Sequence, residues 1–187
     1  DPNANSGTIV GQANAAGAIT VGAVLYTNTP KFGGTPSAAS FSSRGGVTSS
    51  TISNRNKPDI MAPNGVNTTV KLNNIPPGQV DGDQYFNFFG TSAAAPHVAA
   101  AAALYMEAKK KYFLTDTIAT PQEIRNAIKN TALRITAPGS DATVVGAGLI
   151  QVDSMIRRFA NPMPNISELV SIGDSSFAPG TRFMVMG

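Results

Sequence analysis

The segment Gly90-Thr91-Ser92 places a serine after a glycine, at the point where a long apolar run begins. At the start of a helix, backbone N–H groups lack partners and the helix dipole is positive. This location suits a nucleophile that passes through a tetrahedral oxyanion, because the serine's own N–H can donate to that charge. The alternative is an ordinary N-cap, since serine is among the residues preferred there. The pattern is not a Gly-x-Ser-x-Gly elbow, because Ala94 replaces the second glycine.

A nucleophilic serine needs a base, and His97 is the single histidine of the chain. It follows Ser92 by five positions, which is about 140° around a helix. We therefore expect His97 to face away from the serine hydroxyl and to be a packed, hydrogen-bonded helix residue. As a metal ligand it lacks companions, because the sequence has no cysteine and no second histidine.

The residues around the serine predict the elements that must position it. From Ser92 to Tyr112 the sequence is alanine-rich, which predicts a helix, and its apolar character on nearly all sides predicts burial. Thr120-Pro121-Gln-Glu123 predicts the start of a second helix that ends near Leu133. A last short helix is expected over Val152–Phe159. Short apolar or alternating runs predict strands at 19–25, 59–63, 66–72 and 85–89, with a turn at 76–78.

Composition limits the class of protein. The 187 residues are 42% hydrophobic and 13% charged, which favours one globular domain over a disordered chain or a coiled coil. The net charge is +3, and the one run of cations, Lys109–Lys111, suits the end of a helix, so we expect no nucleic-acid partner. The longest apolar stretch, 93–106, is shorter than the ~20 residues of a membrane span, so no span is expected.

Five segments together resemble the subtilisin-like serine peptidases, or subtilases, over about residues 8 to 160. Gly90-Thr-Ser-Ala-Ala-Ala-Pro-His97 resembles the active-site serine signature of that family. The other matching segments are Ile19–Ala23, Phe41–Ser43, Lys57–Pro63 and Gly146–Val152. The resemblance implies an α/β fold: a three-layer sandwich with a mainly parallel sheet, of which this chain holds the C-terminal half.

The resemblance also implies roles for particular residues. Ser92 would be the nucleophile, its backbone N–H would donate into the oxyanion hole, and the Thr91 hydroxyl would support that charge. Gly11 would lie at the floor of the pocket for the residue before the scissile bond, and Gly90 would belong to the substrate-binding site. Asp59 matches an aspartate near a weak cation site in some members, but we expect it to make structural hydrogen bonds.

In subtilases the triad runs Asp, His, Ser, and the motifs of the first two lie upstream of the stretch resembled here, as does the oxyanion asparagine. Asn3 and Asn5 lack the Gly-Asn context of that asparagine, so we expect them in a loop. The chain begins with Asp1 and has the character of the middle of a longer protein. We expect residues 1–160 to be the C-terminal half of a catalytic domain, and residues 161–187 to be a linker and the start of a β-rich module with strands at 169–172 and 182–186.

The resemblance therefore implies a serine endopeptidase that forms an acyl-enzyme on Ser92, acts on peptides or proteins, and receives its Asp, His and Asn from the missing N-terminal half. The chain alone is expected to be inactive. No cofactor is needed for the chemistry, and a structural Ca²⁺ is compatible with the family, although Asp81 and Asp83 are too few for a Ca²⁺ loop. Secretion or display at a bacterial cell surface is also implied.

Two other functions stay open. A pseudoprotease or interaction domain would keep the fold and the serine loop without catalysis. A basic surface-binding module would show strongly salt-dependent binding to polyanions, but the scattered cations argue against it. Half of a parallel sheet would also expose an edge strand, so we expect oligomerisation through that edge.

Overall fold

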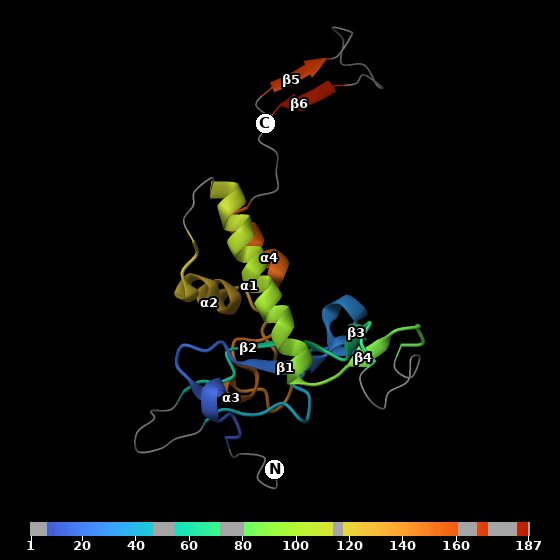
Figure 1. The fold of residues 1–187 in the computed structure, drawn as a ribbon, viewed down its shortest axis with the longest axis vertical. Coiled ribbons are helices and arrows are strands. Elements are labelled where there is room, and N and C mark those ends of the chain that lie inside the picture. Colours follow the sequence, from blue (N-terminus) through green and yellow to red (C-terminus); the bar gives the residue numbers. More distant parts are fainter. Residues whose placement is uncertain are drawn as a thin grey trace.

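The computed structural model describes residues 7–46, 55–71, 81–113 and 118–160, together with the backbone of 168–171 and 183–186. Three short 3-10 helices lie at Gly11–Asn14, Tyr26–Asn28 and Pro30–Phe32. The strands and α-helices (Figure 1) are β1 Val21–Leu25, β2 Ile60–Asn64, β3 Val66–Thr68, β4 Phe86–Phe88, α1 Thr91–Phe113, α2 Pro121–Asn130, α3 Ala142–Val145, α4 Val152–Arg157, β5 Glu168–Ser171 and β6 Phe183–Met186.

Strands β1 and β2 form a parallel pair at the centre of the fold, in register from Val21 opposite Ile60 to Leu25 opposite Asn64. Because side chains alternate across a strand, the pair has two buried faces. One face packs against α1 through Ala23, Ile60 and Ala62. The other contributes Val24 and Met61 to a second cluster with Ile135, Val145 and Leu149. These layers agree with the predicted α/β fold.

Strand β2 continues one residue beyond the expected end at Pro63. Pro63 lies opposite Val24 in the parallel register, and the strand ends at Asn64. Proline is tolerated in a strand where its nitrogen is not required for a ladder hydrogen bond. The extension matters because it brings the buried Asn64 to the end of the sheet nearest the candidate nucleophile.

Strands β3 and β4 form an antiparallel pair in which Val66 lies opposite Phe88 and Thr68 opposite Phe86. Strand β4 agrees with the expected strand at 85–89, whereas β3 is shorter than the expected 66–72. The turn expected at 76–78 lies outside the described residues. Since β4 ends two residues before Gly90, this hairpin delivers the chain directly to α1.

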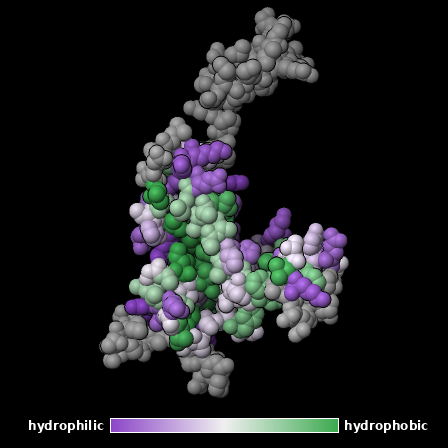
Figure 2. All heavy atoms as spheres, viewed as in Figure 1, coloured by the Kyte–Doolittle hydropathy of each residue, from purple (hydrophilic) through white to green (hydrophobic). Residues whose placement is uncertain are grey.

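Helix α1 confirms the expected helix at 92–112, but it is buried on one side only. Its buried residues follow helical spacing at Ala94, Val98, Ala101 and Tyr105, whereas Leu104 and Met106 are 49% and 40% exposed. Hydrophobic residues can be seen along α1 in Figure 2, with hydrophilic residues gathered near its C-terminal end. The expectation of a fully buried helix is wrong for this chain, because the two-stranded sheet, α2 and α4 contact only part of its surface.

Helix α2 begins as its sequence predicts. The Thr120 hydroxyl accepts the Glu123 N–H, and the Glu123 carboxylate accepts the Thr120 N–H at 2.8 Å, which completes a capping box with Pro121 at the first helical position. The helix ends at Asn130 rather than near Leu133. Lys109 of α1 reaches Glu123 at 2.8 Å and so links the two helices.

At the C-terminal end, β5 and β6 pair antiparallel, close to the two strands expected there. Within the described ranges, no helix is long and apolar enough to cross a membrane.

Candidate active site

Ser92 is the second residue of α1, and its side chain is exposed. The turn before it depends on Gly90, whose φ of +114° lies in the region that favours glycine. A Cβ at Gly90 would lie 3.1 Å from the Ser92 hydroxyl oxygen. The Gly90 carbonyl accepts hydrogen bonds from Ala93 N at 3.0 Å and Ala94 N at 3.3 Å, and so begins the helix. Glycine at this position therefore gives the serine hydroxyl its open surroundings.

The N-terminus of α1 offers donors for negative charge. Thr91 and Ser92 are the first two helical residues, so their N–H groups have no preceding helical turn to bind. The positive end of the helix dipole lies at the same place. Pro96 has no N–H, which also leaves the Ser92 carbonyl without its usual helical hydrogen bond. The arrangement can present a hydroxyl together with backbone donors for an oxyanion, which is the chemistry expected of Ser92 and Thr91.

Asn64, which the sequence analysis did not identify, contacts the Gly90 turn that precedes Ser92. Its side chain is fully buried, and its Oδ1 accepts a hydrogen bond from Gly90 N at 3.4 Å. Among the residues that the structure describes, its Nδ2 has no hydrogen-bond partner. The signal in the sequence is a polar residue directly after the apolar strand Ile60–Pro63.

His97 does not face the serine. Its Nδ1 lies 2.8 Å from the carbonyl oxygen of Ala93, one helical turn back, and its side chain is partly buried. The ring lines a pocket of about 760 Å³ whose walls include Tyr26, Phe32 and Asp81 but not Ser92. His97 is therefore the hydrogen-bonded helix residue that its spacing predicts.

Gly11 lies in a different segment from Gly90, Thr91 and Ser92. It begins the 3-10 helix Gly11–Asn14 with a φ of +60° and is exposed, and apart from its chain neighbours no described residue lies within 4 Å of where a Cβ would stand. The preceding residues are fixed, because Thr8 N and Ile9 N donate to the Arg44 carbonyl at 2.8 and 2.9 Å. The open space at Gly11 is compatible with its predicted place at a pocket floor, which stays a prediction.

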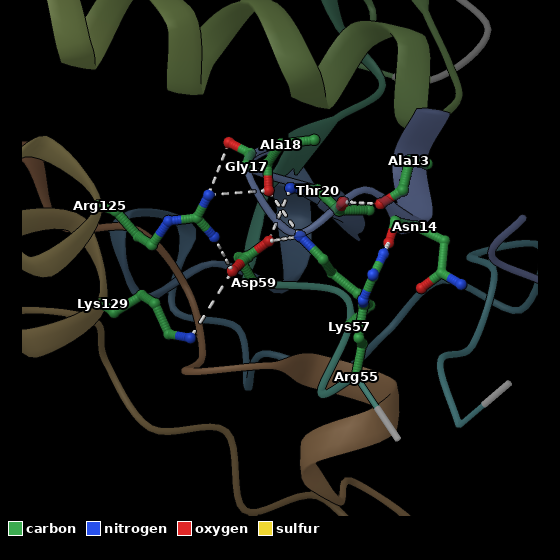
Figure 3. A network of polar contacts seen from close by, with 10 residues as sticks. All are labelled: Ala13, Asn14, Gly17, Ala18, Thr20, Arg55, Lys57, Asp59, Arg125 and Lys129. Atoms are coloured by element: carbon green, nitrogen blue, oxygen red, sulfur yellow. Dashed lines mark hydrogen bonds and ion pairs between the residues drawn. The ribbon is translucent and has the colours of Figure 1, made fainter. Parts of the chain in front are cut away.

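Asp59 lies at the centre of a buried ionic network (Figure 3). Its Oδ2 accepts from Lys57 Nζ at 2.6 Å and from Thr20 N at 2.9 Å, while its Oδ1 lies 2.8 Å from Arg125 and 3.6 Å from Lys129. Burial by itself would raise the pKa of Asp59, but the hydrogen bonds from Lys57 and Thr20 and the charges of Lys57 and Arg125 outweigh it and lower that pKa.

The same network fastens the segment that follows Gly11. Lys57 Nζ donates to the Ala18 carbonyl at 2.5 Å, and Arg125 donates to the Gly17 and Ala18 carbonyls at 2.7 and 3.1 Å. Asp59 thus makes the structural hydrogen bonds that we expected of it. Within the described ranges, no group of three or more His, Cys, Asp or Glu side chains could hold a metal ion.

Comparisons with known proteins agree with one another. The family model of the subtilases matches residues 2–154. The chain is 34% identical over 146 residues to the serine protease AprX of Bacillus subtilis, which covers 74% of this chain and 29% of that protein. Fervidolysin from Fervidobacterium pennivorans, a keratinolytic enzyme related to subtilisin, aligns with a TM-score of 0.54 and 28% identity over 78% of this chain and 20% of its own.

A further solved structure, the CspB protease of Clostridium perfringens, has a TM-score of 0.60 at 24% identity and supports the likeness of fold. It covers 82% of this chain and 29% of its own. The chain therefore spans less than a third of the length of each of these three proteins.

Proposed function

The chain belongs to the subtilase family of serine peptidases, and on this premise we propose that the protein containing it is an endopeptidase that hydrolyses peptide bonds through an acyl-enzyme on Ser92. The observation that carries the proposal is the exposed Ser92 at the N-terminus of α1, after the glycine turn. In the proposal, Ser92 N–H donates to the oxyanion, and the Thr91 hydroxyl assists it. Gly90 and Gly11 contribute to binding of the substrate, a peptide or a protein.

The proposed chemistry has two halves. Ser92 Oγ bonds to the scissile carbonyl carbon while a base accepts its proton, and the resulting oxyanion is stabilised by backbone N–H groups. The C–N bond then breaks, the amine leaves with the proton from the base, and an acyl-enzyme remains. Water attacks the acyl group in the same manner and releases the acid and the free Ser92. These steps need no cofactor.

The base, its orienting carboxylate and the oxyanion asparagine are proposed to come from the upstream part of the protein. Within this chain, His97 is engaged by the Ala93 carbonyl and does not line the serine turn. Loss of triad members typically lowers kcat by about 10⁴–10⁶, because the members act as a unit. We therefore expect the chain alone to be nearly inert toward peptides.

The exposed side of α1 is where the upstream part is proposed to pack. Leu104 and Met106 of this helix are large apolar side chains that are 49% and 40% exposed. Figure 2 shows hydrophobic residues along α1. Contact with an upstream layer would bury these side chains. In the chain alone, the same surfaces would favour oligomerisation.

We place the protein outside the cell or at its surface, which cell fractionation can test.

Labelling with a fluorophosphonate tests the proposal directly. The chain and the full-length protein are each labelled beside their Ser92→Ala variants, and the modified peptide is identified by mass spectrometry. Labelling of Ser92 in the full-length protein alone supports a peptidase whose base lies upstream. Labelling in neither supports a pseudoprotease, and efficient Ser92-dependent hydrolysis by the chain alone contradicts the assignment of the base.

A further inference from the structure

We infer that Asn64 is a positioning residue for the nucleophile: its side-chain carbonyl holds the backbone of the turn from which Ser92 starts. The inference rests on the proposed role of Ser92. Asn64 touches no reacting group itself, and it acts through Gly90.

The chemistry of Asn64 is unusual for its place in the fold. It ends a strand whose residues Ile60, Met61 and Ala62 are fully buried and apolar, and it is itself 0% exposed. Its Nδ2 is buried and has no hydrogen-bond partner within the described ranges, although buried polar groups are nearly always paired. An unpaired buried donor opposes folding, so an apolar side chain would serve stability better at this position. We therefore attribute the Asn64 amide to a role other than stability. The contact made by its oxygen, Oδ1, indicates what that role is.

That other atom, Oδ1, accepts the N–H of Gly90 at 3.4 Å. The carbonyl of the same glycine accepts from Ala93 N and Ala94 N, so Gly90 is held through its nitrogen by the sheet and through its oxygen by α1. Glycine can occupy many backbone conformations at little cost. Without the contact to Asn64, the nitrogen side of Gly90 is free to rotate, and rotation there moves Thr91 and Ser92 with it.

Asn64 is in turn fixed by the neighbouring strands. It lies opposite Leu25 in the parallel register, and the following Gly65 donates to the Phe88 carbonyl at 2.8 Å. Asn87 donates to the Gly65 carbonyl at 2.9 Å. A Cβ at Gly65 would lie only 2.8 Å from the Phe89 ring. The end of β2 and the end of β4 are thus tied together immediately before the serine turn, and Asn64 extends that rigid junction to Gly90.

The expected kinetic consequence is specific. Misplacement of a reacting group by about 1 Å costs roughly 10²-fold in rate. Asn64 acts on Ser92 through Gly90, which is also proposed to bind substrate. Its loss is therefore expected to lower kcat strongly and to change KM by a smaller factor. A residue that merely stabilises the fold would lower the amount of active protein without changing the reactivity of the folded fraction.

The test uses the full-length protein with Asn64→Ala and, as a matched control, Ile60→Val in the same strand. Ile60 is also fully buried but packs against α1 rather than contacting the turn. Measurements are the melting temperature, the rate of fluorophosphonate labelling at Ser92 per folded molecule, kcat and KM. We expect Asn64→Ala to slow labelling by roughly tenfold to a hundredfold. The melting temperature of Ile60→Val should fall by a few degrees, roughly the effect of removing one buried methylene group. Its Ser92 should label at the wild-type rate.

Hydrogen exchange of the Gly90 N–H supplies a readout that needs no activity. In the wild type it should exchange more slowly than the N–H groups of Thr91 and Ser92, and the protection should vanish in Asn64→Ala. An unprotected Gly90 amide in the wild type overturns the inference even if the variant does not fold. So does a wild-type labelling rate in folded Asn64→Ala, or an equal loss of rate in Ile60→Val.

The two readouts separate this inference from the proposed function. If Ser92 fails to label in the wild type while Gly90 protection depends on Asn64, the peptidase proposal falls and the positioning contact stands. If Ser92 labels normally and Asn64→Ala changes neither rate nor exchange, the peptidase proposal stands and the inference about Asn64 falls.

Discussion

Lys57 and Asp59 form a buried ion pair, with Nζ and Oδ2 2.6 Å apart and the two side chains only 4% and 3% exposed. The pair stands between two elements distant in sequence. On one side it fixes the Ala18 carbonyl and the Thr20 N–H, and on the other it meets Arg125 of α2. The segment that follows Gly11 is thus held by these charged groups as well as by the packing of Ile19 against the core.

Replacement of Asp59 by alanine should strongly destabilise the fold. The change leaves Lys57 buried without its carboxylate partner, and breaking a buried pair in this way typically costs about 3–5 kcal/mol. Urea unfolding of the full-length protein measures the loss. Asp141→Asn is a useful control, because Asp141 is exposed and pairs with Arg44 only at 3.8 Å, so its salt bridge should contribute less than about 1 kcal/mol. Equal losses in the two variants would contradict the importance of the buried network.

The capping box of α2 should make stability depend on pH at the acid end. Hydrogen bonds from Lys109 and from the Thr120 N–H and hydroxyl lower the pKa of Glu123 from 4.5 to about 2. Because the folded pKa is depressed, the stabilisation is fully present above pH 4.5 and is lost as pH falls toward 2. Glu123→Gln should therefore remove part of the decline in melting temperature between these values. An unchanged decline would show that Glu123 does not titrate as described.

Gly90→Ala should impair the nucleophile more than the fold. The added Cβ would lie 3.1 Å from the Ser92 oxygen, and alanine is strained at a φ of +114°. We expect Ser92 labelling in the full-length protein to fall by roughly tenfold or more, because a displaced hydroxyl loses its attack geometry. Gly139→Ala is the matched control, since Gly139 also has positive φ but nothing within 4 Å of a Cβ. Gly139→Ala should show the effect of backbone strain alone, and Ser92 should label in it at the normal rate.

His97→Gln in the full-length protein should leave the pH dependence of Ser92 labelling unchanged. The histidine bonds to the Ala93 carbonyl and lines a pocket whose walls do not include Ser92, so we expect it to carry no proton for the proposed reaction. We expect the labelling rate to stay within about tenfold of wild type, whereas loss of a true general base costs far more. A rate reduced by several powers of ten, or a missing pKa in the profile, would identify His97 as the base.

Local patterns predicted the elements around the serine well. The capping box at Thr120 is readable from four consecutive residues, and α1 follows from its alanine content. The ionic network was not predictable, because Arg125 and Asp59 are 66 positions apart and nothing in either neighbourhood specifies the other. Burial of α1 was overestimated for a related reason. An apolar sequence indicates that a helix requires packing partners, but it does not tell whether this stretch of chain contains them.

The Asn64 contact shows the same limit at the site itself. The sequence marks Ser92 through its long motif, whereas Asn64 lies 28 positions earlier and appears only as a polar residue after Pro63. The contact between Asn64 and Gly90 depends on β2 continuing through that proline and on the β3–β4 hairpin leading the chain back to Gly90. Both are properties of the sheet and not of any local pattern.

The network around Asp59 also sets an order in which the molecule can assemble. Contacts between residues far apart in sequence form slowly, because a long loop must close before they contribute. The carbonyls of Gly17 and Ala18 receive Arg125 across more than a hundred residues. During synthesis on the ribosome, the contacts of Arg125 with this segment can therefore form only after α2 has emerged. Until then, the segment is held through Ala18 and Thr20 by Lys57 and Asp59, without the contribution of Arg125.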